Sequence, residues 1–178
     1  MKKNTKVLNL ATIGIMTAII CVLGPLSIPI GLVPISLTNL AIFFALYALG
    51  MKKGTISCLL YILIGFVGMP VFSGFTGGAA KFFGPTGGYI IGYICMALIA
   101  GLFIDKFIKK WYMSLLGMIL GTVVLYTFGT AWLAYQAELT VSAALMAGVI
   151  PFIPGDLLKI AIVTILGPKI RKALIKSD

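Results

Sequence analysis

The 178-residue sequence contains no histidine and only four acidic residues, and these shortages remove most routes to enzymatic catalysis. Asp178 is terminal, and Asp105 and Glu138 lie between apolar runs, so Asp156 is the one carboxylate expected inside such a run. A paired-carboxylate protease needs two acids at one site, a zinc centre needs several histidine, cysteine or acidic ligands, and a serine nucleophile needs a base. The composition therefore argues against an enzyme and against a metal or other cofactor.

Charged residues are also scarce, at 10% of the chain against 61% hydrophobic residues. This balance excludes a water-soluble globular domain, in which about a quarter of the residues are charged. The three cysteines, Cys21, Cys58 and Cys95, fall in separate apolar runs without C-x-x-C spacing, so we interpret them as small core residues. The sequence also lacks a G-x-x-x-x-G-K-[ST] phosphate loop, so ATP hydrolysis by that route is not expected.

Six apolar runs predict an all-α membrane protein in which residues 1–178 form one domain of six transmembrane helices. A helix that crosses the bilayer needs about 20 residues, so the shorter runs must extend into their flanking segments. The runs cover about Leu8–Leu23, Ile35–Gly50, Thr55–Val67, Gly88–Ile104, Trp111–Tyr135 and Ile153–Leu166.

Basic residues explain the net charge of +10, and most of them gather in alternate connections between the runs. They form short clusters without interleaved aromatics, so the charge indicates membrane topology rather than nucleic-acid binding. The positive-inside rule predicts a multi-pass protein of the cell membrane with both termini in the cytoplasm. The clusters are Lys2, Lys3 and Lys6, then Lys52 and Lys53, then Lys106, Lys109 and Lys110, and finally Lys169, Arg171, Lys172 and Lys176.

Proline and glycine mark the opposite, outward connections. Seven of the eight prolines lie in or beside them, and eight of the 21 glycines fall between Gly65 and Gly88. Non-helical backbone at membrane depth is tolerated only where it is buried or lines a cavity. The glycine-rich loop between the third and fourth helices therefore predicts an outward-facing pocket, with a flexible linker as the alternative; Phe72 and its neighbouring phenylalanines favour a packed loop.

Asp156 and Lys159 are three residues apart at the start of the last run, which places them on one helix face. Ionisable residues inside a membrane are functional sites by default, and this pair offers one acceptor group and three donors to a small polar ligand. In the structural alternative, Asp156 caps the helix and Lys159 neutralises it or extends toward the surface.

Small residues recur at four-residue spacing in three of the runs. Gly88-x-x-x-Gly92 in the fourth run and Gly117-x-x-x-Gly121 in the fifth predict close helix packing within the protein. Gly14 and Ala18 in the first run could instead dock a partner, because a chain without a motor of its own needs one for accumulation.

Three strings carry a resemblance that covers nearly the whole chain. The first string is interrupted and consists of Gly68-Met69-Pro70-Val71-Phe72, Gly77-Gly78 and Gly84-Pro85-Thr86-Gly87-Gly88-Tyr89. The second is Pro151-Phe152-Ile153-Pro154-Gly155-Asp156-Leu157-Leu158-Lys159, and the third is Val33-Pro34-Ile35-Ser36-Leu37. In these the chain resembles the biotin-specific substrate-capture (S) component of energy-coupling-factor vitamin transporters. The family usually has glutamine near Thr38 and alanine at both ends of the docking spacing, here Gly14 and Ala18.

The resemblance implies that the chain captures biotin outside the membrane and works with a transmembrane coupling protein and two cytoplasmic ATPases. We expect Asp156 and Lys159 to bind the ureido ring or the carboxylate, and the loop from Met69 to Tyr89 to cover the ligand. The remaining expected binding residues are Ser36, Thr38, Phe72, Gly77, Gly78, Thr86 and Tyr89. A small autonomous facilitator or channel for a polar solute is the alternative, and an intramembrane enzyme is a third.

Overall fold

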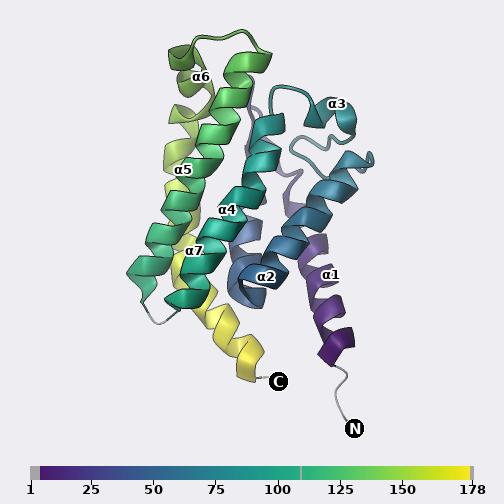
Figure 1. Ribbon diagram of the computed structural model, residues 1–178, viewed down its shortest axis with the longest axis vertical. Coiled ribbons are helices and arrows are strands. Elements are labelled where there is room, and N and C mark those ends of the chain that lie inside the picture. Colours follow the sequence, from purple (N-terminus) through teal and green to yellow (C-terminus); the bar gives the residue numbers. More distant parts are fainter. Residues whose placement is uncertain (1–4, 109, 177–178) are drawn as a thin grey trace.

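Helices make up most of the computed structural model, which describes residues 5–108 and 110–176 (Figure 1). The elements are α1 (Thr5–Leu23), β1 (Ser27–Ile28), β2 (Ile35–Ser36), α2 (Thr38–Phe66), α3 (Ala79–Phe82), α4 (Gly87–Lys106), α5 (Trp111–Gln136), α6 (Val141–Gly148), the 3₁₀ turn η1 (Ile150–Phe152) and α7 (Ile153–Lys176). The predicted all-α class is confirmed. The two short strands pair antiparallel, with Ser27 opposite Ser36.

Five helical stretches in the described part of the chain are long and apolar enough to cross a membrane. They account for the six predicted runs because α2 is broken at Gly50, whose φ of 79° is not helical. Gly54 lies against Leu46 and Ala45, eight and nine residues earlier, a contact that a straight helix cannot make. The two arms of α2, 38–49 and 51–66, therefore fold back on each other as a hairpin (Figure 1).

The helices do not share all the bounds of the predicted apolar runs. The second run was expected to begin at Ile35, but Ile35 and Ser36 form β2, and the helix starts at Thr38. The last was expected to end at Leu166, whereas α7 continues to Lys176, with Pro168 inside it. A helix need not end where the apolar run ends, because its polar turns can continue beyond the bilayer.

The basic clusters meet at one end of the bundle, which also carries both chain termini (Figure 1). Asp105, in the last turn of α4, accepts hydrogen bonds from the backbone N–H of Met51 at 2.7 Å and from Arg171 at 2.8 Å. Lys53 donates to the side-chain oxygen of Asn9 at 2.6 Å. These contacts join α1, the α2 hairpin, α4 and α7 there. Lys2, Lys3 and Lys109 of the predicted clusters lie outside the described residues.

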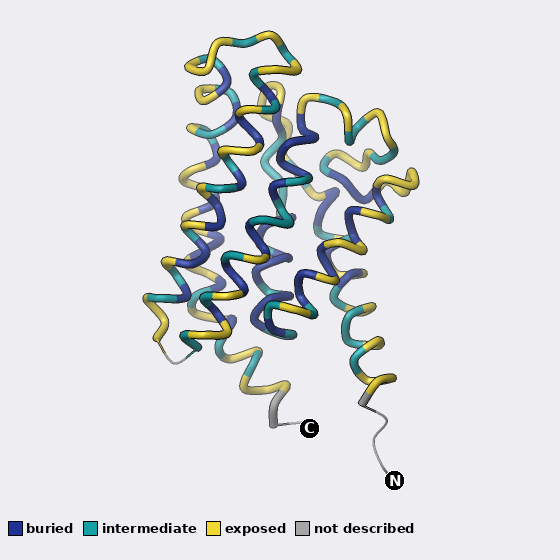
Figure 2. The backbone as a smooth tube through the Cα atoms, viewed as in Figure 1, coloured by how far each residue is buried: buried dark blue, intermediate teal, exposed yellow. Residues whose placement is uncertain are grey.

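Helices α4 and α5 pack antiparallel through the predicted small residues. Gly92 lies against Leu125, and Gly121 lies against Met96, so a side chain at either glycine would separate the helices. Gly88 and Gly117 make even closer contacts, with Trp132 and Phe103 of the facing helix. The predicted packing of these four glycines is confirmed, and it produces the buried centre of the bundle (Figure 2).

The loops at the opposite end are tied to the helices and to one another. The N–H of Gly74 donates to the carbonyl of Pro25 at 3.1 Å, and the indole N–H of Trp132 donates to the carbonyl of Gly84 at 2.9 Å. The ring of Phe72 packs directly on Gly65. The glycine-rich segment is therefore a packed loop, which favours the predicted pocket over a flexible linker.

Candidate ligand-binding site

A cavity lies at the loop end of the bundle, between α2, α4, α5, α7 and the glycine-rich loop. Its free volume is about 50 Å³, which is small for a ligand site, so the surrounding side chains lie close together. Polar groups on its wall come from Ser36, Thr38, Asn39, Lys81, Thr86, Asp156 and Lys159, and aromatic rings come from Tyr61, Phe72, Tyr89, Tyr93, Tyr126 and Phe152.

The ion pair of Asp156 and Lys159 forms the charged wall of the cavity. Lys159 Nζ lies 2.9 Å from Asp156 Oδ1, and the two residues are only 7% and 6% exposed. Lys159 also donates to the backbone carbonyl of Ser36 at 2.6 Å, and Tyr126 donates its hydroxyl to Asp156 Oδ2 at 2.7 Å. Each charge is thus compensated by its partner and by one further hydrogen bond, which a buried ion pair needs.

The local chain explains why this pair points into the cavity. The turn η1 leads directly into α7, so Asp156 lies in the first turn of that helix and Lys159 lies one turn further on the same face. Asp156 is the fourth residue of α7. Its carboxylate accepts hydrogen bonds from Tyr126 of α5 and from Lys159 of α7. Asp156 therefore does not act as a side-chain helix cap, whereas its ion pair with Lys159 agrees with the neutralising role that the same alternative gave to the lysine.

Further polar groups lie around the ion pair. The Ser36 hydroxyl donates to Thr38 Oγ1 at 3.0 Å. The Thr86 hydroxyl is buried, and no residue in the described ranges hydrogen-bonds to it. Burial also lowers the pKa of the half-buried Lys81, in the short loop helix α3, below its ordinary value. An unpartnered hydroxyl and a partly desolvated cation therefore both lie on this wall.

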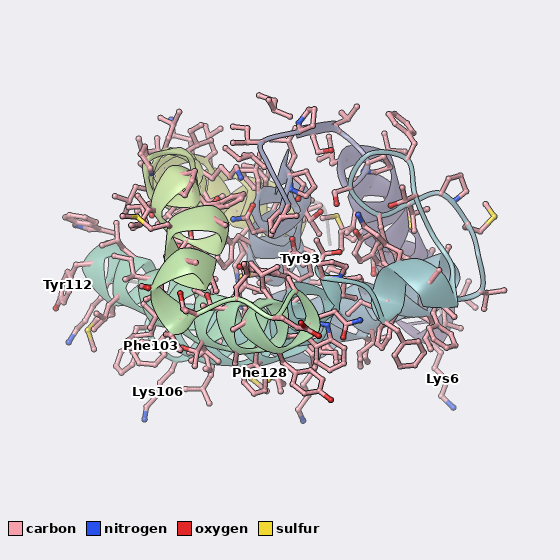
Figure 3. The ribbon with its side chains drawn as sticks, turned by 90° about the horizontal axis from the view of Figure 1, so that it is seen from above. Lys6, Tyr93, Phe103, Lys106, Tyr112 and Phe128 are labelled. Atoms are coloured by element: carbon pink, nitrogen blue, oxygen red, sulfur yellow. The ribbon has the colours of Figure 1, made fainter. Side chains whose placement is uncertain are left out.

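Aromatic side chains supply the apolar part of the cavity. Tyr61 and Phe72 meet edge to face, with ring centroids 5.6 Å apart. Tyr89 reaches across to α6, where its hydroxyl donates to the carbonyl of Gly148 at 2.8 Å. Tyr93 lies in the interior between the helices, whereas Lys106 and Tyr112 project from the edge of the bundle (Figure 3).

Most of the residues expected from the sequence meet at this cavity. Ser36, Thr38, Phe72, Thr86, Tyr89, Asp156 and Lys159 all line it. Gly77 and Gly78 are not on its wall: Gly77 packs against the carbonyl of Met69, and Gly78 adopts a φ of +86° that favours glycine. Their expected backbone contacts with a ligand remain a prediction.

Sequence reasoning missed several lining residues, chiefly Asn39, Tyr61, Tyr93 and Tyr126. A polar side chain inside an apolar run was the available signal, but the chain has other such positions that face elsewhere. Only the packing of the helices distinguishes the tyrosine that reaches Asp156 from those that do not.

Gly14 and Ala18 lie away from the cavity, exposed on the surface of α1. A β-carbon at Gly14 would meet no atom within 4 Å, so this position does not pack within the described structure. The pair is therefore available on the lipid-facing side of α1.

A helical membrane bundle with a charged, aromatic-walled cavity at one end defines a multi-pass membrane protein with a candidate site for a small molecule. Comparison with protein families identifies which one: a model described as the BioY family matches residues 1–176, and the chain belongs to this family.

Individual proteins are similar over almost their whole lengths. The biotin transporter BioY2 of Lactococcus lactis subsp. cremoris is 37% identical over 172 residues, which cover 97% of this chain and 94% of the relative. The biotin transporter BioY of Thermotoga maritima is 36% identical over 162 residues, covering 89% and 93%. Among solved structures, the S-component for biotin from an ECF-type ABC transporter matches with a TM-score of 0.87 and 36% identity, covering 97% of this chain and 95% of that one.

Proposed function

We infer that this chain captures biotin at the membrane as the substrate-specific subunit of an ECF-type ABC importer. The family, the relatives that are biotin transporters and the matching S-component support this function. The observation that carries it in the structure is the buried pair of Asp156 and Lys159, which lines the cavity together with aromatic rings and neutral polar groups.

The chemistry of biotin complements the cavity wall. The ureido ring presents N–H donors and a carbonyl acceptor, and the fused bicycle is largely apolar. Asp156 accepts from a ureido N–H, and Lys159, with two of its donors used by Asp156 and Ser36 in the described chain, donates to the ureido carbonyl. Tyr93 and Phe72 enclose the bicycle, and Ser36, Thr38 and Thr86 provide neutral hydrogen bonds.

Lys81 is our candidate partner for the valerate carboxylate. It lies in α3 of the glycine-rich loop and reaches the cavity wall, whereas the charge of Lys159 is already compensated by Asp156. A carboxylate at Lys81 would restore the charge stabilisation that burial removes. The two ends of the ligand then meet different cations.

The loop from Met69 to Tyr89 covers the bound ligand in this proposal. Its residues Phe72, Lys81 and Thr86 line the cavity, so biotin would hold the loop against the bundle. Lys81 is also a trypsin cleavage site, and we expect biotin to slow cleavage after it. Equal cleavage rates with and without biotin would refute the role of the loop as a lid.

The partners in this proposal are a transmembrane coupling protein and two cytoplasmic ATPases, because the chain carries no phosphate loop. The coupling protein docks on α1 at Gly14 and Ala18, where exposed small residues permit close approach of a second helix. The basic end of the bundle faces the cytoplasm of the cell, and the cavity opens outward.

Binding of radiolabelled biotin to the purified chain in nanodiscs, without partners, tests this function. A capture subunit retains biotin and gains thermal stability from it, as any ligand selective for the folded state provides. A facilitator would bind biotin weakly and transport it across vesicle membranes without ATP. A folded chain that neither retains biotin nor responds to it in thermal unfolding would refute the proposal.

A further inference from the structure

A second hollow lies on the membrane-facing surface of the bundle, between α5 on one side and the path of α6 and α7 on the other. This groove has a volume of about 650 Å³. Its walls are almost entirely hydrocarbon, and several of the side chains on its edges are well exposed, among them Val123, Leu145 and Leu157. Nothing in the biotin chemistry described above uses this groove.

Small side chains on α5 create the depth of the groove. Thr127, Ala131 and Ala134 follow one another at helical spacing along its floor. The hydroxyl of Thr127 donates to the carbonyl of Val123 within its own helix at 2.9 Å, so it requires no polar partner from outside. The groove therefore suits an apolar occupant.

The position of the groove along the helix fixes its depth in the bilayer. It extends from Ile119 to Ala134 of α5, a length of roughly 22 Å at 1.5 Å per residue. Ala134 is near the cavity end of α5, and Ile119 is beyond its middle, so the groove begins near that membrane surface and passes the midplane. At this depth the surrounding medium is lipid hydrocarbon, whose core is about 30 Å thick.

We propose that this groove binds one acyl chain of a membrane lipid from the leaflet at the cavity end. A methylene group occupies about as much space as a water molecule, roughly 30 Å³, so a chain of ordinary length fills most of the groove. A second copy of the chain is the competing occupant, which the experiments below distinguish from a lipid chain.

The acyl chain would lie directly behind the biotin cavity. Tyr126 and Asp156 line both the groove and the cavity, and the hydrogen bond between them separates the two spaces. A chain in the groove keeps water away from the outer side of this pair. The lipid would therefore form part of the low-dielectric wall around the charged ligand contacts.

Photo-crosslinking tests the proposal directly. One copy of the chain per nanodisc is combined with phosphatidylcholine that carries a diazirine midway along one acyl chain, and the labelled residues are located by mass spectrometry. We expect severalfold more label on the groove residues, such as Ala131 and Leu157, than on the equally lipid-accessible residues Leu10 and Val22 of α1. Even labelling of both surfaces would overturn the proposal.

Two variants sharpen the result. Ala131→Phe fills the groove and should reduce the excess label to the level of α1, whereas Ala11→Phe, at an exposed alanine of α1, should leave it unchanged. An excess that survives Ala131→Phe would refute the groove as its source. The biotin affinity of each variant shows independently that it is folded. If the excess label on the groove residues is lost in vesicles crowded with the chain, a second copy of the chain occupies the groove instead of a lipid.

Discussion

Replacing Asp156 by asparagine removes the charge of the ion pair while preserving its shape. The amide nitrogen can face Tyr126, which then accepts instead of donating, and the amide oxygen can still face Lys159. The ammonium of Lys159, only 7% exposed, loses its counter-charge. Breaking a buried pair in this way costs about 3–5 kcal/mol, so we expect a marked loss of thermal stability in the absence of biotin.

The effect on affinity is separate from the effect on stability. A hydrogen bond between a charged group and a ligand contributes about 1.5–3 kcal/mol. Its loss should therefore raise the dissociation constant for biotin roughly 10- to 150-fold. Titration calorimetry with biotin measures the affinity, and thermal unfolding measures the stability. The double variant Asp156→Asn with Lys159→Met should recover part of the stability but none of the affinity, because no unpaired buried charge remains.

Asp105→Asn is the matched control, since Asp105 forms an ion pair with Arg171 at the opposite end of the bundle. Its carboxylate is 38% exposed, so the substitution should cost little stability and leave the affinity unchanged. The reasoning is refuted if folded Asp156→Asn protein binds biotin as tightly as the unmodified chain does.

Three further predictions concern other parts of the molecule. Gly65→Ala should force the ring of Phe72 into the cavity and weaken biotin binding by about 1–3 kcal/mol, whereas Gly14→Ala, which meets no neighbour, should not; calorimetry compares them. The affinity for biotin should fall as the pH rises through the pKa of Lys81, which burial lowers below 10.5, because the neutral amine no longer attracts the valerate carboxylate. This pH dependence should disappear in Lys81→Met and also when biotin methyl ester is the ligand. Gly14→Trp and Ala18→Trp should preserve biotin binding but abolish co-purification of the coupling protein and ATP-driven uptake, and a parallel loss of binding would exclude α1 as the docking face.

Local patterns in the sequence determined the class of the protein. The lengths of the apolar runs predicted membrane-spanning helices, and the alternation of basic clusters and prolines predicted which connections share an end of the bundle. The spacing of Asp156 and Lys159 placed both on one helix face, since three residues make nearly one turn. These properties depend only on residues that are close together in the chain, so they can be predicted from a single sequence.

Contacts between distant residues were decided only by the tertiary structure. The carbonyl of Ser36 meets Lys159 across 123 positions, and Tyr126 reaches Asp156 across 30, so no local spacing could have identified either partner. Gly78 shows the same limit: glycine content alone does not distinguish a ligand contact from a turn with positive φ. Which helix faces meet is set by close packing throughout the bundle, and that packing both assembles the biotin cavity and leaves the lipid groove open behind it.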